Sequence, residues 1–302
     1  MNRYGRVVVL YGGPSSEREV SLKSGAAVLA ALLAQGIDAH GLDVGAGFVD
    51  RLLSGGYDRA FIMVHGRLGE DGAIQGLLET LGIPYTGSRV AASAVAMDKV
   101  LSKAIFRAAG IPTPDYRVLQ NETDAEGLRD GRFPLILKPA QEGSSIGVHK
   151  VLAPADLMEA YRNTRAYGPV LAEQCIEGPE YTCAILGERV LPLIRLETPQ
   201  GFYDYEAKYI LNTTRYHCPA GLSDQKEHEL REVALSAYRA LGAEGWGRVD
   251  LMADAALRPY VLELNTVPGM TDHSLVPMAA RAVGLSLEDV VEMILAQTLR
   301  MP

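Results

Sequence analysis

Two polar, glycine-rich segments in the first third of the chain each follow a short apolar run, and this placement constrains the fold strongly. The segments are GGPSSEREVS at 12–21 and HGRLGEDG at 65–72, after the apolar runs at 6–11 and 59–64. An amphipathic stretch at 19–34 lies between the runs, as expected for a helix that connects parallel strands. Because open parallel sheets bind ligands at the carboxyl ends of their strands, the two polar segments predict a ligand site.

The alternation of strand-like and helix-like segments predicts three domains, and a length of 302 residues is enough for more than one. In the first domain a further strand-like run at 39–44 joins the other two, so we expect a parallel sheet covered by helices. The two later domains look mixed, with strands that face helices on one side. We therefore predict an α/β fold with α+β character in the later part, and domains at 1–96, 97–179 and 180–302.

The later domains carry their own strand and helix signals. These are a helix at 98–109, strands at 134–140 and 169–175, a hairpin around Gly187 and Glu188, a helix from Asp224, a hairpin at 248–265, and helices from Ser274 and Ser286. Residues 198–223 have no such signal. A loop of that length in a compact domain is more often functional than incidental, so we predict a lid at about 200–222.

The charge balance excludes several classes of partner. With 29 Lys and Arg against 37 Asp and Glu, the net charge of −8 argues against nucleic-acid backbones and anionic membranes. No apolar segment approaches the roughly 18 residues of a membrane-spanning helix, so we expect a cytoplasmic protein. The three cysteines are an odd number without CxxC spacing, which predicts reduced thiols rather than disulfides or a zinc ribbon.

The hairpin at 248–265 places polar residues of two strands side by side. Residues two apart in a strand share a face, so Arg248 and Asp250 point together, as do Glu263 and Asn265. The intervening positions are expected to face the core; they are Val249, Leu251, Leu262 and Leu264. Carboxylate and amide oxygens suit Mg²⁺. The alternative is a solvated sheet face, where alternating polar residues are common.

Two lysines are candidates for contact with phosphate. Lys138 lies in an apolar strand, where an unpaired ammonium group is costly, so it needs an anion. The segment EGSSIG at 142–147 follows, and its backbone N–H groups and hydroxyls can approach a phosphate closely. It matches neither a Walker A nor a Rossmann motif, and a flexible turn is the alternative. Lys99 opens a predicted helix, and a surface lysine is the alternative there.

The polar segments of the first domain contain further candidates. Glu17 is placed to hold an ammonium group, and His65 to orient a carboxylate or hydroxyl. Glu70 and Asp71 are expected to cap the helix that follows them. Cys175 and Cys183 are expected to be buried, as free cysteines usually are.

Taken together, these residues resemble the D-alanine:D-alanine ligases of the ATP-grasp superfamily. The resemblance covers essentially the whole chain in order, through GGPSSEREVSLKSG at 12–25, HGRLGEDGAIQG at 65–76, MDK at 97–99, LKPAQEGSSIGV at 137–148, FYDYEAKY at 202–209, GWGRVDLM at 245–252 and LELNTVPGMTDHSLVPMAA at 262–280. It implies an ATP-grasp fold in which two mixed domains sandwich ATP. It also implies that two D-alanines are joined at the expense of ATP, for peptidoglycan precursor synthesis.

The resemblance implies a set of ATP and metal contacts. The phosphates would meet Lys99, Lys138 and Lys208, with Ser144 and Ser145 in the loop that closes over them, Glu173 at the adenine and Glu180 at the ribose. Two Mg²⁺ ions, for which Mn²⁺ can substitute, would be held by Asp250, Glu263 and Asn265. Gln174 departs from the family pattern, which often has lysine beside the adenine.

The resemblance also implies the substrate contacts. Glu17 would bind the ammonium group of the first D-alanine, and Ser274 with Leu275 the carboxylate of the second. Arg248 and the N–H of Gly269 would stabilise the developing oxyanion, while the lid would bring Lys208 and Tyr209 over the site. We further expect a homodimer.

Two other functions remain open at this point. The first is a related ligase that uses D-lactate or D-serine as the second substrate, although Tyr209 favours the dipeptide. The second is a non-catalytic module that senses ATP. Such a module needs the lysine and the glycine-rich loop but not the hairpin residues, so their joint presence favours an enzyme.

Overall fold

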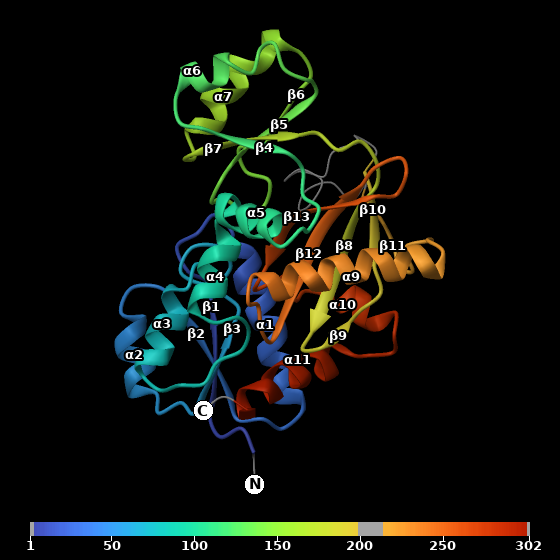
Figure 1. The fold of residues 1–302 in the computed structure, drawn as a ribbon. Helices are drawn as coiled ribbons and strands as arrows, with labels where there is room; N and C mark the ends of the chain where they lie inside the picture. The colour runs from blue at the N-terminus through green and yellow to red at the C-terminus, as the bar shows by residue number, and fades with distance from the viewer. Residues whose placement is uncertain (1–2, 199–213, 301–302) are drawn as a thin grey trace.

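The computed structural model describes residues 3–198 and 214–300, which form three sheets with their helices (Figure 1). The N-terminal sheet is parallel, with strand order β2-β1-β3. Its strands are β1 (Val7–Tyr11), β2 (Ala39–Asp43) and β3 (Arg59–Ile62), and its helices are α1 (Arg18–Ala34), α2 (Phe48–Ser54), α3 (Ala73–Thr80) and α4 (Val90–Met97). The pairing confirms the predicted parallel sheet, and its strands β1 and β3 are largely apolar and buried.

The central sheet is antiparallel, in the order β4-β7-β5-β6, and stands apart from the other two at the top of Figure 1. Its strands are β4 (Tyr116–Leu119), β5 (Leu135–Pro139), β6 (His149–Val151) and β7 (Val170–Gln174). Helices α6 (Glu122–Glu126) and α7 (Leu157–Arg165) cover one face, with η1 (Pro154–Asp156) before α7. Helix α5 (Lys99–Ala108) precedes the sheet, and the Asp98 carboxylate caps it by accepting from the N–H groups of Val100 and Leu101.

The C-terminal sheet has the order β11-β10-β8-β12-β13, with β9 paired to β8. Its strands are β8 (Glu180–Leu186), β9 (Arg189–Val190), β10 (Ile194–Glu197), β11 (Arg215–His217), β12 (Trp246–Ala253) and β13 (Pro259–Asn265). The long helix α9 (Asp224–Ala240) packs on β12 and β13. The remaining helices are α10 (Leu275–Arg281), α11 (Leu287–Ala296) and η2 (Gln297–Arg300).

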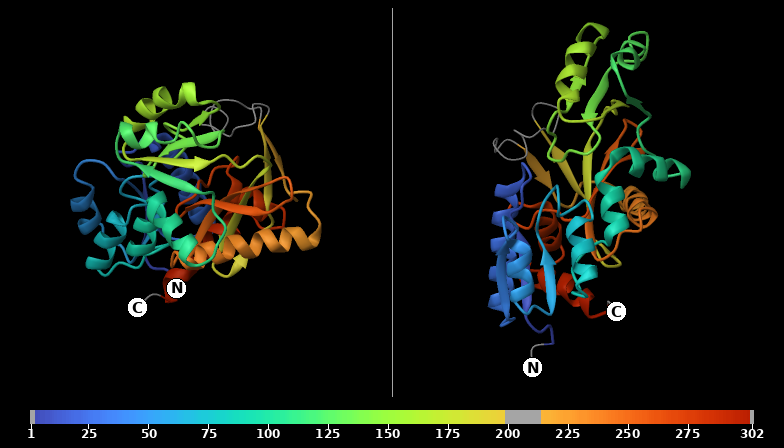
Figure 2. Two further views of the ribbon diagram at one scale, coloured as in Figure 1. Left: turned by 45° about the horizontal axis from the view of Figure 1, so that its top comes forward. Right: turned by 90° about the vertical axis from the view of Figure 1, so that its left-hand side faces the viewer.

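The N-terminal and C-terminal sheets share one apolar core. Helix α11 packs against α1, and both α10 and α11 contact β8. A single cluster of buried side chains therefore includes Val8 and Leu32 from the first domain together with Ala184 and Val291. The central sheet has a separate core around Leu137 and lies to one side of the other two sheets (Figure 2). No helix in the described ranges has the length and hydropathy to cross a bilayer.

One strand lies where a structureless stretch was expected. Within 198–223, residues 199–213 are outside the described residues, but Arg215–His217 forms β11. It pairs with β10, and an ion pair joins His217 to Glu197 with Nε2 and Oε2 2.7 Å apart. A three-residue polar edge strand has no alternation of its own. Only pairing with β10 makes it a strand, so the local pattern could not predict it.

Candidate active site

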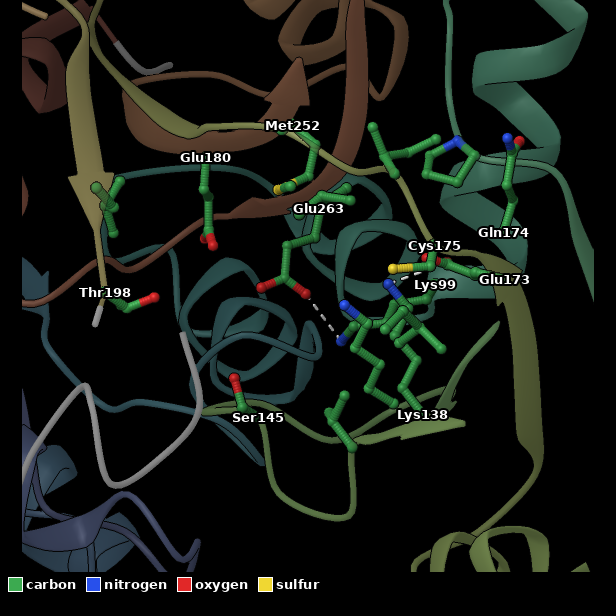
Figure 3. Close-up of a pocket in the computed structure, with 18 of the residues that line it drawn as sticks. Lys99, Lys138, Ser145, Glu173, Gln174, Cys175, Glu180, Thr198, Met252 and Glu263 are labelled. Carbon is green, nitrogen blue, oxygen red and sulfur yellow. Dashed lines mark ion pairs between the residues drawn. The ribbon is translucent and has the colours of Figure 1, made fainter. Parts of the chain in front are cut away.

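A cleft of about 550 Å³ lies between the central and C-terminal sheets (Figure 3). Strands β5 and β7 and the loop at 142–145 line it on one side, and β12, β13 and the ends of β8 and β10 on the other. The residues lining it include seven that the sequence singled out for ATP or metal, namely Lys99, Lys138, Ser144, Ser145, Glu173, Glu180 and Glu263. The fold thus brings distant sequence positions to one place.

A buried carboxylate supplies the anion that Lys138 was expected to need. The Oε1 atom of Glu173 on β7 lies 2.9 Å from the Nζ atom of Lys138 on β5. The same oxygen lies 2.9 Å from the Nζ atom of Lys103 on α5. Burial opposes ionisation of Glu173, but the two ammonium groups outweigh it and lower its pKa. The Glu173 side chain therefore faces two lysines, and the contact with adenine that the resemblance implies for this residue stays a prediction.

Lys103 was missed by the sequence analysis, which assigned no role to it. Its side chain is 0% exposed, and burial lowers its pKa to about 8 even beside Glu173. Its ammonium also donates to Thr113 Oγ1 at 2.6 Å. A signal was present, because Lys103 lies three positions before Phe106 and four after Lys99, on the buried face of α5.

Lys99 reaches across the cleft to the opposite sheet. Its Nζ atom lies 3.1 Å from Oε2 of Glu263 and donates to the carbonyl of Glu142 at 2.8 Å. Figure 3 shows Glu263 extending from the C-terminal sheet toward the lysines. Burial opposes the charge of Lys99, but Glu263 outweighs it and raises the pKa. Lys99 is thus a buried ion-pair partner rather than a surface lysine.

The hairpin residues meet as the two-residue periodicity predicts. Arg248 lies opposite Asn265, and Asp250 opposite Glu263. The guanidinium of Arg248 donates through Nε and Nη2 to the two carboxylate oxygens of Asp250, at 2.8 and 2.7 Å. Asn265 Nδ2 and Thr182 Oγ1 donate to the same carboxylate at 2.9 and 2.5 Å. Four polar groups are therefore held together by hydrogen bonds beside Glu263, which lines the cleft.

Leu262 does not face the core, which corrects the expectation for this hairpin. The register shifts between Asp250 and Leu251, so that Leu251 pairs with Val261 and leaves Leu262 without a partner residue across the strand. This bulge turns both Leu262 and Glu263 toward the cleft, while Val249, Leu251 and Leu264 are buried as predicted. An inserted residue cannot be recognised from alternation alone.

Glu17 meets the glycine-rich loop of the central domain. The Ser144 hydroxyl donates to the Glu17 carboxylate, which joins positions 127 residues apart in the chain. Ser144 and Ser145 both have left-handed backbone conformations, with φ of 52° and 59°, which non-glycine residues rarely adopt. The loop is therefore held in a strained conformation where the cleft meets the N-terminal domain.

His65 orients a hydroxyl, and does so inside the protein. Its Nδ1 lies 2.7 Å from the carbonyl oxygen of Val267, so Nδ1 carries the proton, and Nε2 lies 3.4 Å from Ser24 Oγ. Burial lowers the pKa of His65, which keeps the imidazole neutral at physiological pH. Ser24 Oγ in turn accepts from the N–H of Met270 at 3.1 Å. His65 thus positions the segment that follows β13.

That segment contains Gly269, where a side chain would not fit. A Cβ atom at Gly269 would lie 2.9 Å from Ser274 Oγ. Ser274 occupies the N-cap position of α10, but its hydroxyl bonds Thr271, accepting from the N–H at 2.9 Å, rather than capping the helix. Leu275 is buried at the start of α10. The predicted oxyanion donor and carboxylate contacts therefore lie in one short, tightly packed segment.

Glu70 does not cap α3, contrary to expectation, whereas Asp71 does bond the start of that helix. The N-cap of α3 is Gly72, without a side-chain cap. Glu70 instead accepts from the N–H of Gly66 at 2.7 Å and from that of Val267 at 3.1 Å. Asp71 accepts from the N–H of Ala73, the first residue of α3, at 3.0 Å, and from that of Leu68 at 3.0 Å. Glu70 therefore ties the loop after β3 to the segment after β13, a long-range contact that the capping signature conceals.

The Glu70 carboxyl predicts a pH dependence of stability. Burial raises its pKa to about 8, from 4.5. Because this pKa is higher in the folded state, its contribution to stability is present at acid pH and is lost as pH rises through about 8. We expect the free energy of unfolding of Glu70→Gln, measured in urea from pH 6 to 9, to fall less over this range than that of the unmodified protein. Exposed Glu232→Gln is the control, and parallel curves for Glu70→Gln and the unmodified protein would refute the prediction.

The remaining predictions concern the two cysteines expected to be buried, Gln174 and the residues assigned to the lid. Cys183 is buried as expected, but Cys175 is only half-buried, because the linker after β7 runs along the cleft and turns its sulfur toward it (Figure 3). Gln174 is exposed at the end of β7, directly before this linker. Lys208 and Tyr209, the residues assigned to the lid, lie outside the described residues.

Two antiparallel sheets enclose a cleft that presents lysines from one side and a carboxylate hairpin from the other, as in an ATP-grasp ligase. Two family models match the chain, "D-ala D-ala ligase C-terminus" over residues 105–296 and "D-ala D-ala ligase N-terminus" over 49–88. The chain belongs to the D-alanine–D-alanine ligase family.

Individual relatives agree with this assignment. The D-alanine–D-alanine ligase of Nitrosococcus oceani is 57% identical over 98% of this chain and 94% of its own length. That of Ectopseudomonas mendocina is 56% identical over 98% and 95%. Among solved structures, the Bacillus anthracis D-alanine–D-alanine ligase complexed with ATP has a TM-score of 0.84 at 32% identity, covering 98% of both chains. The VanG D-Ala:D-Ser ligase of Enterococcus faecalis has a TM-score of 0.85 at 28% identity, covering 98% of this chain and 100% of its own.

Proposed function

We infer that this chain joins two D-alanine molecules into D-alanyl-D-alanine, with ATP converted to ADP and phosphate, for peptidoglycan precursor synthesis. Sequence identities of 57% and 56% to D-alanine–D-alanine ligases, each over 98% of this chain, support this function. The single observation on the site that carries it is the cleft itself, where Lys99 and Lys138 face Glu263 across a space between two sheets. A polyphosphate and a divalent cation both need such an arrangement of opposite charges.

The chemistry requires that a carboxylate be activated before an amine attacks it. Transfer of the γ-phosphoryl group to the first D-alanine makes an acyl phosphate, whose phosphate then leaves as the second amine adds. We propose that Lys99, Lys138 and Lys208 neutralise the phosphates, that Ser144 and Ser145 close over them, and that Glu180 meets the ribose. Water would hydrolyse the intermediate, so we assign Lys208 and Tyr209 to a lid that excludes it.

The hairpin fits a magnesium site. Among residues 3–198 and 214–300, no three His, Cys, Asp or Glu side chains gather as a metal centre, and the hairpin offers two carboxylates with one amide. This set suits Mg²⁺, which takes one or two carboxylates and completes its shell with water and phosphate. We propose that Asp250, Glu263 and Asn265 hold two Mg²⁺ ions, replaceable by Mn²⁺, which supply positive charge to the phosphates.

The substrate contacts are assigned to the far side of the glycine-rich loop. We propose that Glu17 binds the ammonium group of the first D-alanine, which its contact with Ser144 places beside the phosphate loop. Ser274 and Leu275 are assigned to the carboxylate of the second D-alanine. Arg248 and the N–H of Gly269 are assigned to the tetrahedral oxygen. His65 would act indirectly, without touching the substrate, by holding the segment that contains Gly269.

We propose the domain organisation 1–96, 97–179 and 180–302, a cytoplasmic location and a homodimer for the complete protein. The test of function is phosphate release with ATP, Mg²⁺ and D-alanine, compared with the same mixture lacking D-alanine, and mass spectrometry of the product. D-alanine-dependent release with a dipeptide product supports the ligase. Binding of ATP without D-alanine-dependent release would instead favour an ATP-sensing module.

The choice of second substrate is a separate prediction, carried by Tyr209. The VanG D-Ala:D-Ser ligase has a similar fold, so the fold alone does not determine which second substrate is used. We propose that the tyrosine hydroxyl hydrogen-bonds to Ser144, and losing such a bond costs roughly 0.5 to 1.5 kcal/mol. We expect Tyr209→Phe to raise the ratio of D-alanyl-D-lactate to D-alanyl-D-alanine by about tenfold. Both acceptors are offered at equal concentration at pH 6.5, with Tyr57→Phe as control, and an unchanged ratio removes Tyr209 from acceptor selection.

A further inference from the structure

Three buried charged groups at the wall of the cleft carry two positive charges and one negative charge. Lys103, Lys138 and Glu173 come from α5, β5 and β7, and a single oxygen of Glu173 lies 2.9 Å from both ammonium groups. Their side chains are 0%, 9% and 3% exposed. Two positive charges thus share one negative charge where water is excluded, and an uncompensated buried charge is costly.

Only one of the two lysines can contact a ligand. Lys138 lines the cleft, whereas Lys103 lies behind Glu173 and is fully buried. If Lys103 were absent, Glu173 and Lys138 would form a neutral pair with little net attraction for an anion. With Lys103 in place, its charge balances Glu173, and the charge of Lys138 remains available to a phosphate.

Lys103 is also held firmly in its position. Its ammonium donates to Thr113 Oγ1, and Thr113 Oγ1 donates to the carbonyl of Val261 on β13 at 2.8 Å. Strand β13 also carries Glu263. Lys103 therefore connects the central sheet to the hairpin on the opposite side of the cleft.

We propose that Lys103 is a positioning residue for ATP, which neutralises Glu173 and thereby directs the charge of Lys138 toward the phosphates. This inference rests on the proposed function, since it presupposes that ATP occupies the cleft. Lys103 does not touch the nucleotide in this arrangement. It acts through Glu173 and Lys138, so its effect should depend on the charge of the ligand.

The test compares ligands that differ in phosphate charge. Binding of Mg²⁺-ATP and of adenosine is measured by calorimetry for the unmodified protein, Lys103→Met and Lys103→Gln, with circular dichroism and Tm to check folding. We expect ATP affinity to fall by about tenfold or more in Lys103→Met, because one buried charge is removed. Adenosine affinity and the KM for D-alanine should stay within about twofold, since neither carries phosphate. Lys226→Met removes a partly exposed ammonium on α9, which pairs with Glu229 and does not line the cleft, and should leave both affinities unchanged.

A double variant distinguishes charge balance from simple damage. Lys103→Met combined with Glu173→Gln removes one positive and one negative charge and again leaves Lys138 uncompensated. With Glu173→Gln alone as the reference, we expect Lys103→Met to cost at most about threefold in ATP affinity when it is added to Glu173→Gln, against tenfold or more in the unmodified protein, whereas structural damage would make the two losses add. If Lys103→Met does not fold, the ATP and adenosine affinities of Lys103→Gln provide the same test.

Two outcomes overturn the inference. One is an equal loss of ATP and adenosine affinity, which would mean that Lys103 only supports the fold. The other is unchanged ATP affinity in a folded Lys103 variant. Failure of the proposed function is a different result, because the unmodified protein itself would then not bind ATP or would form no dipeptide.

Discussion

Glu263→Gln is expected to abolish ligation while leaving the protein folded. The substitution keeps the shape of the side chain but removes a negative charge that faces the cleft and pairs with Lys99. A metal site built from two carboxylates cannot lose one without losing much of its attraction for Mg²⁺. We expect kcat to fall by about a thousandfold or more, which corresponds to about 4 kcal/mol in the activation free energy.

The measurement is D-alanine-dependent phosphate release at millimolar Mg²⁺. Glu159→Gln, at an exposed position on α7, is the control for loss of a carboxylate and should retain full activity. Circular dichroism and Tm show whether the fold is kept. Near-normal turnover of a folded Glu263→Gln protein would remove Glu263 from the metal site.

Arg248→Met is expected to lower kcat by about a hundredfold to a thousandfold, by analogy with loss of one donor from an oxyanion hole. Arg248 presents its guanidinium on the cleft side of β12, where two hydrogen bonds to Asp250 fix its direction. Its loss also leaves the Asp250 carboxylate without its cationic partner. Arg248→Lys should lose less, because the charge remains, but it cannot form the same two-point contact.

A matched control lies at the turn of the same hairpin. Arg258 also pairs with an aspartate, Asp254, but its side chain is 71% exposed and lies away from the cleft. Arg258→Met should therefore keep kcat. Comparable losses in Arg248→Met and Arg258→Met would indicate that the hairpin as a whole, rather than a directed donor, is required.

Much of the fold was predictable because its signals are local. The apolar runs that became β1 and β3, and the helix from Asp98, each carry their pattern within a few residues. The β11 strand was not predictable, since three polar residues become a strand only when β10 pairs with them. The same applies to Leu262, whose direction depends on a bulge between two strands.

The candidate site also contains residues that the sequence could predict and contacts that it could not. Motif residues such as Lys138, Asp250 and Glu263 were recognisable from residue type and spacing, and the fold brings them to one cleft or to its hairpin. Their partners were not recognisable. Glu70 looked like a helix cap because a capping residue and a long-range acceptor have the same composition, and its bond to Val267 crosses 197 residues.

The amino-acid sequence by itself determined the family, the order of strands and helices, and the residue types available for ATP, metal and D-alanine. These properties are local, because they depend on neighbours along the chain. Only the tertiary structure decided which charges balance one another, as when Lys103, Lys138 and Glu173 meet from three separate elements. Burial and Coulomb interactions depend on distance in space, which the linear order of residues does not specify.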